Sequence, residues 1–149
     1  MKENMFANRE DYRNLSDILD RWTSDEMNMK EVFLRLADRF SKKSGAALSV
    51  VARPGISYSF RAREKAEDGT LITMIDIVDD DPDSRWLSVC FYGDRVTDPK
   101  EEGDLVPGGL LGEDGHCFDL YENNESIIAY VEQRIDEAYE NTMKLSAHG

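Results

Sequence analysis

Residues 56–92 read ISYSFRAREKAEDGTLITMIDIVDDDPDSRWLSVCFY, and three apolar runs in this stretch are separated by two short polar segments. In the first run, 56–63, apolar and polar side chains alternate, which indicates a strand with one covered face and one wet face. The run at 71–78 is more continuously apolar and is typical of a central strand, and 85–92 forms the next strand. Because the connecting segments are short, we expect these strands to pair antiparallel.

The flanking sequence extends this sheet and adds helices. Segment 46–52 predicts a strand that ends at the turn-forming Arg53-Pro54-Gly55, and 116–121 predicts a short fifth strand. Elsewhere apolar residues recur at steps of three and four, which predicts helices over about 11–22, 25–43 and 125–145.

These elements predict one α+β domain covering residues 1–149. We expect two layers: an antiparallel sheet of about five strands, with two N-terminal helices and one C-terminal helix packed mainly on one face. Residues 1–10 and 146–149 are expected to be frayed. Residues 97–115 contain two prolines and five glycines, which predicts a long loop.

The composition is that of a small acidic soluble protein: 40% of residues are hydrophobic, 33% are charged, and the formal net charge is −13. No apolar run approaches the roughly 20 residues that a membrane helix needs, and the polar start does not resemble a signal peptide. We therefore expect a cytoplasmic protein without membrane association. In that reducing compartment Cys90 and Cys117 are expected to be free thiols inside the fold.

The segment VDDDPDSRW, residues 78–86, raises the question of a calcium loop. Asp79, Asp81 and Asp83 match the first three ligand positions of an EF-hand, but Ser84 stands where glycine is needed and Cys90 where a bidentate glutamate is needed. A strand also follows where an EF-hand begins a helix. Proline and aspartate between two apolar strands are typical of a hairpin turn, which is the interpretation we favour.

Positive charge is concentrated in residues 35–65, which hold eight bases and two acids. Within it, one strand face is predicted to carry serines and arginines, which suit phosphate or carboxylate groups because guanidinium binds these in bidentate fashion. The candidate anion- or partner-binding residues are Arg53, Ser57, Ser59, Arg61 and Arg63. The alternative is that this basic segment packs beside the acidic C-terminal half and is neutralised by it.

The sequence shows no constellation that indicates catalysis, a metal or a cofactor. His116 and Cys117 are adjacent in a predicted strand and must face opposite sides, so they cannot form a catalytic pair. No Cys/His set suits zinc, and no P-loop, nucleophile elbow or zinc-protease motif occurs. Asp76, flanked by isoleucines, is expected to pair with Arg61 or Arg63 across the sheet.

Three functional hypotheses follow. We favour a non-enzymatic binding or interaction module that contacts a protein partner or forms a homodimer. One alternative is an anion- or nucleic-acid-binding protein that uses the basic strand at 53–63, although the net charge of −13 argues against nucleic acid. The other alternative is an enzyme with an unrecognised carboxylate and arginine site, and the sequence leans against it.

Overall fold

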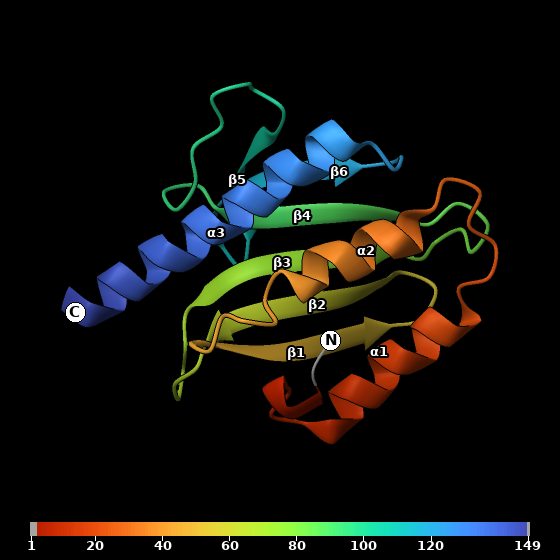
Figure 1. Ribbon diagram of the computed structural model, residues 1–149, viewed down its shortest axis with the longest axis horizontal. Coiled ribbons are helices and arrows are strands. Elements are labelled where there is room, and N and C mark those ends of the chain that lie inside the picture. The colour runs from red at the N-terminus through yellow and green to blue at the C-terminus, as the bar shows by residue number, and fades with distance from the viewer. Residues whose placement is uncertain (1–2, 149) are drawn as a thin grey trace.

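The computed structural model describes residues 3–148 of the 149-residue chain, and Figure 1 shows helices lying over one sheet. None of the described helices is long and apolar enough to cross a membrane. The elements in chain order are η1 (Glu3–Met5), α1 (Arg9–Arg21), α2 (Met29–Asp38), β1 (Ala46–Arg53), β2 (Ser57–Glu64), β3 (Leu71–Val78), β4 (Trp86–Tyr92), β5 (Asp104–Leu110), β6 (Glu113–Leu120) and α3 (Glu125–His148).

The sheet is antiparallel throughout, in the order β1-β2-β3-β4-β6-β5. The predicted α+β class is therefore confirmed, with six strands in place of about five. The difference lies in 97–115, which was expected to be a loop but contains β5 and the start of β6. Every residue of β5 except Leu110 is exposed, so no apolar alternation marked this strand in the sequence. Leu111 and Gly112 have φ angles of 51° and 86° and make the tight turn between the two strands.

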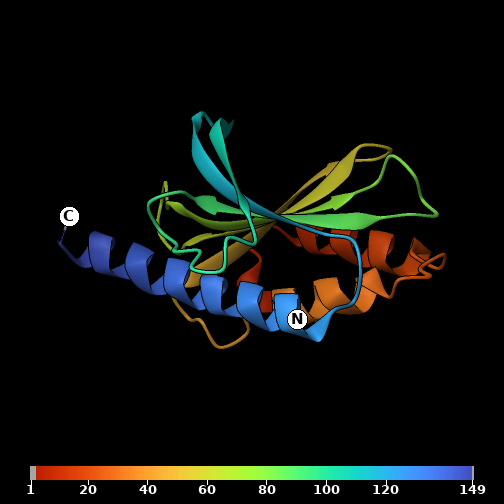
Figure 2. The same cartoon turned by 90° about the horizontal axis from the view of Figure 1, so that it is seen from above.

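The three α-helices cover one face of the sheet, and in the described part of the chain no helix lies on the other face (Figure 2). Alternating residues of the strands point toward the helices and form the main core. On β2 these are Tyr58, Phe60 and Ala62, as the alternation in 56–63 predicted. Ile56, expected beside them, precedes β2 in a turn and is 63% exposed.

Side-chain oxygens set where the helices begin. Asn8 accepts a hydrogen bond from the backbone N–H of Glu10 at the start of α1, and Asn124 caps α3. The second helix is shorter than the predicted 25–43. The Asp25 carboxylate accepts hydrogen bonds from the backbone N–H groups at 29 and 30, so α2 begins only at Met29.

Arg35 of α2, and Arg39 and Lys43 of the turn after it, are neutralised by α3, which agrees for these three bases with one of the two alternatives. Their partners are acidic residues on the facing side of α3: Arg35 pairs with Glu132 at 2.7 Å, and Lys43 pairs with Asp136 at 2.7 Å. Burial alone would raise the pKa of Asp136, but hydrogen bonds from Arg39 and Lys43 outweigh it and lower that pKa. The positive charges of Arg35, Arg39 and Lys43 therefore stabilise the contact between α2, the turn after it and α3.

The acidic segment after β3 forms the predicted hairpin turn. Asp79 points inward, where its carboxylate lies 2.6 Å from Arg85 Nε and accepts a hydrogen bond from the backbone N–H of Gly55. Arg85 in turn lies over the ring of Trp22. Within the described residues, no group of three or more His, Cys, Asp or Glu side chains is arranged to hold a metal ion.

The chain ends are more ordered than expected. Residues 1–10 were predicted to fray, but η1 forms at Glu3–Met5 and Phe6 makes a bridge to Leu48 of β1, because its ring packs into the core. At the other end α3 continues to His148, so the helix covers most of the predicted frayed segment 146–149. Residues 1, 2 and 149 lie outside the described residues.

A polar network holds the segment between β4 and β5 against α3. Asp98 lies 2.8 Å from His116 Nε2, accepts a hydrogen bond from the Tyr130 hydroxyl, and accepts two more from the backbone N–H groups of Glu102 and Gly103. Burial would raise the pKa of Asp98, but these four hydrogen bonds outweigh it and hold the pKa well below its usual range. His116 faces this network while Cys117 faces the other side, as the alternation predicted.

This network predicts acid sensitivity. A carboxyl whose pKa is lower in the folded state stabilises the fold above its unfolded pKa of about 3.9, and this stabilisation is lost as pH falls through the folded pKa. Asp98→Asn is expected to lower the free energy of unfolding at neutral pH by about 1.5–3 kcal/mol and to flatten its decline below about pH 4. Denaturation at a series of pH values measures both. Asp104→Asn at an exposed position is the control, and equal effects of the two variants would contradict this role for Asp98.

Candidate functional site

The five residues that the sequence singled out lie together on the face of the sheet that no helix covers. Arg53 of β1 is the direct cross-strand partner of Ser57 of β2, so their side chains share a face. Ser59, Arg61 and Arg63 follow along β2 at every second position and point the same way. Arg53 is exposed and Arg61 and Arg63 are half-buried, whereas Ser59 is only 5% exposed.

A row of polar side chains crosses the middle of this face. Ser59 of β2 lies opposite Asp76 of β3, Asp76 lies opposite Ser88 of β4, and Ser88 lies opposite Asp119 of β6. The sequence pointed to Ser59 and Asp76 but not to Ser88 and Asp119. Polar side chains within apolar strands could have marked Ser88 and Asp119 as candidates. Only the strand register shows that they lie in one row with Ser59 and Asp76.

Asp76 differs from its expected state. Among the described residues it makes no salt bridge, so the predicted ion pair with Arg61 or Arg63 is wrong, and its buried Oδ1 atom has no hydrogen-bond partner. Burial raises the pKa of Asp76, while hydrogen bonding with Ser59 and the charges of Arg61 and Arg53 oppose that rise. Arg61 Nε donates instead to Ser59 Oγ at 3.2 Å, so the serine stands between the two charged groups.

The arginines of this face are not neutralised. Within residues 3–148, Arg53, Arg61 and Arg63 have no carboxylate oxygen within the 4 Å of a salt bridge, in contrast to Arg35, Arg39 and Lys43 between the helices, whose partners lie on α3. Burial lowers the pKa of Arg61, although the charge of Asp76 opposes this. Three arginines without a salt-bridge partner among the described residues thus lie on this face, beside Asp76 and Asp119, in a protein whose net charge is −13.

Aromatic and apolar side chains flank the arginines at one end of the face. Trp86 of β4 stacks on Tyr121, with ring centroids 4.7 Å apart and an interplanar angle of 28°. Tyr121 is 58% exposed, and Ile56 is exposed in the turn that leads into β2. Stacked rings of this kind offer a flat apolar surface with polar edges.

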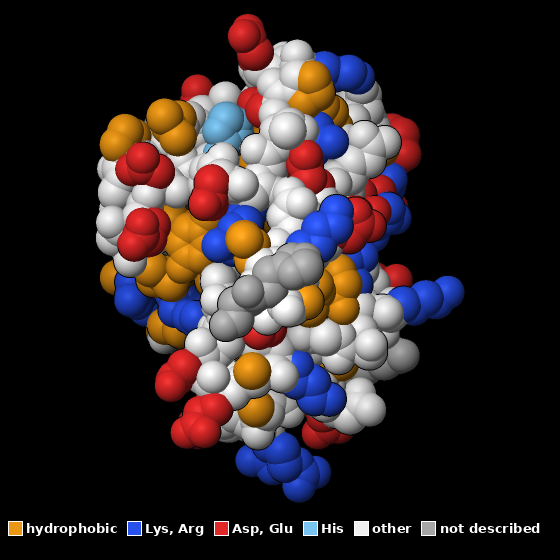
Figure 3. Space-filling model, turned by 90° about the vertical axis from the view of Figure 1, so that its left-hand side faces the viewer, with side chains coloured by type: hydrophobic (Ala, Val, Ile, Leu, Met, Phe, Trp, Pro, Cys, Tyr) orange, Lys and Arg blue, Asp and Glu red, His pale blue; other side chains and the backbone are white. Residues whose placement is uncertain are grey.

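The other end of the face is covered by the β5–β6 hairpin. Leu110 of β5 is buried there against Leu71 and Met74 of β3, and Cys90 and Tyr92 of β4 pack against this second cluster. In Figure 3, which views the side on which the C-terminus lies, hydrophobic side chains gather in one area with Lys and Arg side chains beside them and acidic side chains above. The arginine-bearing part of the face thus lies between two apolar ends.

Cys90 and Cys117 form a disulfide on this same face. They are direct cross-strand partners on β4 and β6, and their sulfur atoms are bonded, so the prediction of two free thiols is wrong. Their separation of 27 residues gave no sign of pairing, because β5 lies between β4 and β6 in the sequence but at the edge of the sheet.

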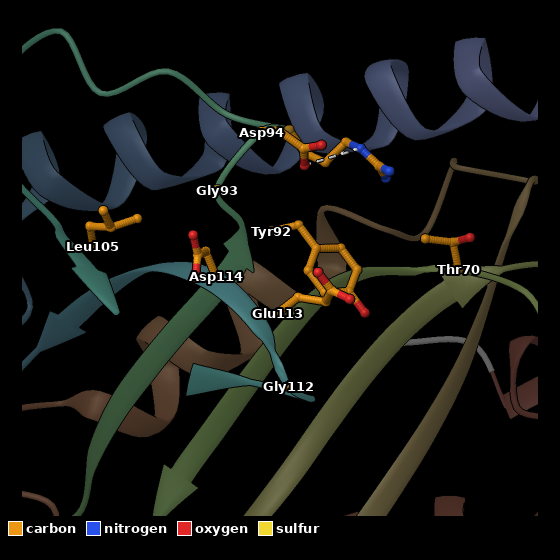
Figure 4. Close-up of a pocket in the computed structure, with 9 residues that line it drawn as sticks. Thr70, Tyr92, Gly93, Asp94, Leu105, Gly112, Glu113 and Asp114 are labelled. Carbon is orange, nitrogen blue, oxygen red and sulfur yellow. Dashed lines mark ion pairs between the residues drawn. The ribbon is translucent and has the colours of Figure 1, made fainter. Parts of the chain in front are cut away.

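A depression of about 720 Å³ lies beyond the hairpin end, between the start of β3, the end of β4 and the turn before β6 (Figure 4). The side chains of Tyr92 and Glu113 overlap in this view, and Thr70 lies apart from them near the start of β3. Arg95 lies 5.9 Å from the Tyr92 ring centroid, and its Nε is 3.5 Å from Asp94. The depression is lined by Thr70, Tyr92, Gly93, Asp94, Arg95, Leu105, Gly112, Glu113 and Asp114, so carboxylates dominate its charge.

The chain matches no protein-family model, no curated protein and no solved structure. What the site does must therefore be argued from its own chemistry. The arrangement places arginine donors, serines and a stacked aromatic pair on one sheet face that no described helix covers.

Proposed function

We propose that this protein is a non-enzymatic binding module that holds an acidic segment of a partner protein on the uncovered face of its sheet. The observation that carries the proposal is the contrast between two sets of bases. Arg35, Arg39 and Lys43 each form an ion pair with a carboxylate on α3. The arginines of β1 and β2 have no such partner among the described residues.

Carboxylates are the groups that this face suits best. A guanidinium group binds a carboxylate through two parallel hydrogen bonds, and such pairs gain strength where water is partly excluded. Arg61 is partly buried, and its Nε donates to Ser59 Oγ, which leaves its terminal nitrogens to bind a carboxylate. A segment bearing two or three glutamate or aspartate side chains would supply carboxylate partners for these arginines.

The aromatic end supports a peptide ligand in particular. Trp86 and Tyr121 are stacked and Ile56 is exposed, so an apolar side chain next to the acidic ones would find a surface to cover. The outer edge of β1 is less open to a partner strand. There Asp11 already accepts a hydrogen bond from the N–H of Val50, and Phe6 bridges Leu48.

The net charge of −13 supports a short acidic segment over nucleic acid. A polyanion must bring many phosphates near this acidic surface, whereas a short segment places a few charges on the arginines alone. A second copy of this chain could supply acidic side chains too, and the homodimer is then an outcome of the test below. A pocket lined by Asp76 and Arg61 would favour the enzyme hypothesis, but the depression in Figure 4 is lined by neither. The cytoplasmic location stays a prediction.

A labelled hexaglutamate peptide is the probe that tests this function. Its affinity for the protein is measured by fluorescence anisotropy at low and at high salt. The affinity for a short labelled DNA duplex is measured in the same way for comparison. We expect the peptide to bind, and the double variant Arg61→Glu/Arg63→Glu to bind it at least about tenfold more weakly, because each lost charged hydrogen bond is worth about 1.5 kcal/mol or more.

The matched control is Arg9→Glu/Arg13→Glu, which changes the net charge equally on exposed residues of α1. A loss of affinity confined to the β2 variant supports the proposal. Equal losses in both variants, no binding of the peptide, or tighter binding of the DNA duplex would overturn it. If charge reversal unfolds the protein, Arg61→Gln/Arg63→Gln removes the two charges with a smaller change and serves for the same comparison. Sedimentation analysis shows whether a second copy of the chain, and not a partner protein, occupies the face.

A further inference from the structure

The disulfide lies in an unusual place for a structural cross-link. Cys90 and Cys117 are directly opposed on neighbouring strands, with Cα atoms 4.1 Å apart, and both are half-buried on the uncovered face. We propose that Cys90 and Cys117 are a redox-active pair that cycles between disulfide and dithiol by exchange with dithiol reductants. The proposal is independent of the acidic partner.

The fold around the pair does not need the bond. Strands β4 and β6 are already held in register from Leu87 opposite Leu120 to Tyr92 opposite Gly115, on both sides of the cysteines. The side chains that pack between these strands and the helices, such as Val89 and Phe118, lie on the other face and belong to the main core. The dithiol form therefore keeps the backbone ladder and the core that hold the two strands together.

The sulfur atoms also lie where a reductant can reach them. No described helix covers their face (Figure 2). Cys90 packs against the small cluster under the hairpin, and both cysteines are half-buried. Ser88 Oγ is 3.6 Å from Cys90 Sγ, so its hydroxyl can donate to that sulfur when it carries negative charge. Cys117 lies opposite Asp104 of β5, whose negative charge disfavours charge on the Cys117 sulfur. Cys90 is therefore the better leaving sulfur.

The exchange balances with a dithiol as the only co-reactant. One thiolate of the reductant attacks Cys117 Sγ, the protein S–S bond breaks, and Cys90 leaves as a thiolate and takes up a proton. The second thiol of the reductant loses its proton and attacks the mixed disulfide, forming the reductant's own disulfide and releasing Cys117 as a thiol. The protein gains two electrons and two protons, and the reverse steps restore the disulfide.

Thiol titration of the native protein tests the proposal. The full chain is equilibrated in mixtures of reduced and oxidised dithiothreitol, trapped with an alkylating reagent and analysed by mass spectrometry. We expect two thiols to appear together, reversibly, while circular dichroism shows a folded protein in both states. The rate of reduction should lie within about tenfold of the rate in denaturant, because exchange needs access to only one sulfur.

Single replacements provide the control. In Cys90→Ser and Cys117→Ser the remaining thiol of the folded protein should react with the alkylating reagent, and it should form a mixed disulfide with a small disulfide reagent. Reduction that occurs only after unfolding, or that itself unfolds the chain, would make the bond a structural cross-link and overturn the proposal. Failure of oxidised dithiothreitol to form any disulfide would overturn it as well.

Discussion

Replacing Asp79 with asparagine is expected to lower the free energy of unfolding by about 3–5 kcal/mol, because the guanidinium of Arg85 is then buried without its counter-charge. Only 7% of the Asp79 side chain and 5% of the Arg85 side chain are exposed, and the two atoms that pair are 2.6 Å apart. The other Asp79 oxygen holds the N–H of Gly55, so the same carboxylate ties the β1–β2 turn to the β3–β4 turn.

Equilibrium unfolding in urea measures this effect, and Asp80→Asn is the matched control. Asp80 is the next residue along the chain and is exposed, so its replacement should change the free energy of unfolding by less than about 0.5 kcal/mol. The double variant Asp79→Asn/Arg85→Met should recover part of the loss, since no charge is then left buried. A loss below about 1 kcal/mol in Asp79→Asn would show that Arg85 reaches water.

Truncating Phe60 to alanine is expected to cost about 3–5 kcal/mol, because it removes a large buried side chain from the centre of the core. Phe60 is fully buried, and its ring lies 5.6 Å from the ring of Phe33 on α2 and 6.4 Å from that of Phe6. The lost contacts therefore join the sheet, α2 and the N-terminal segment.

Ile56→Ala is the control for this truncation. Ile56 precedes the same strand but is 63% exposed, so its loss should cost less than about 0.5 kcal/mol. Similar costs for the two variants, measured by the same unfolding experiment, would contradict the placement of the core between β2 and the helices.

The three strands within residues 56–92 and the turn after β3 were predicted correctly because alternation and turn chemistry agreed there, although the states of Ile56, Asp76 and Cys90 were not. Tyr58, Phe60 and Ala62 face the helices, and the aspartates after β3 form a hairpin turn. β5 was missed because its glycines and proline and its exposed surface carry no apolar period. Local patterns thus predict elements well when each has one buried face.

The site could be predicted only in part, for the same physical reason. The arginines and serines of β2 share a face by their spacing alone, so the sequence could group them. The row through Asp76, Ser88 and Asp119, and the bond between the two cysteines, depend on which strands are neighbours. Strand order is set by contacts between distant segments, which local patterns do not contain.

The basic segment also depends on contacts that local patterns do not contain. From the sequence, residues 35–65 could be neutralised as a whole or could form a site as a whole. The structure divides them: Arg35, Arg39 and Lys43 pair with α3, and the arginines of β2 do not share these partners. Charge counts cannot separate two faces of one segment, because a helix and a strand turn their side chains differently.

Nuclear magnetic resonance titration of the isotope-labelled protein with the hexaglutamate peptide tests the proposed binding face most directly. We predict that the side-chain N–H signals of Arg53, Arg61 and Arg63 and the backbone signals of the strands around them shift together and saturate. Signals of Arg35 and Arg39, which are already paired with α3, should stay in place. Shifts confined to the helices, or no saturable shift on β1 and β2, would contradict a binding site on the uncovered face of the sheet.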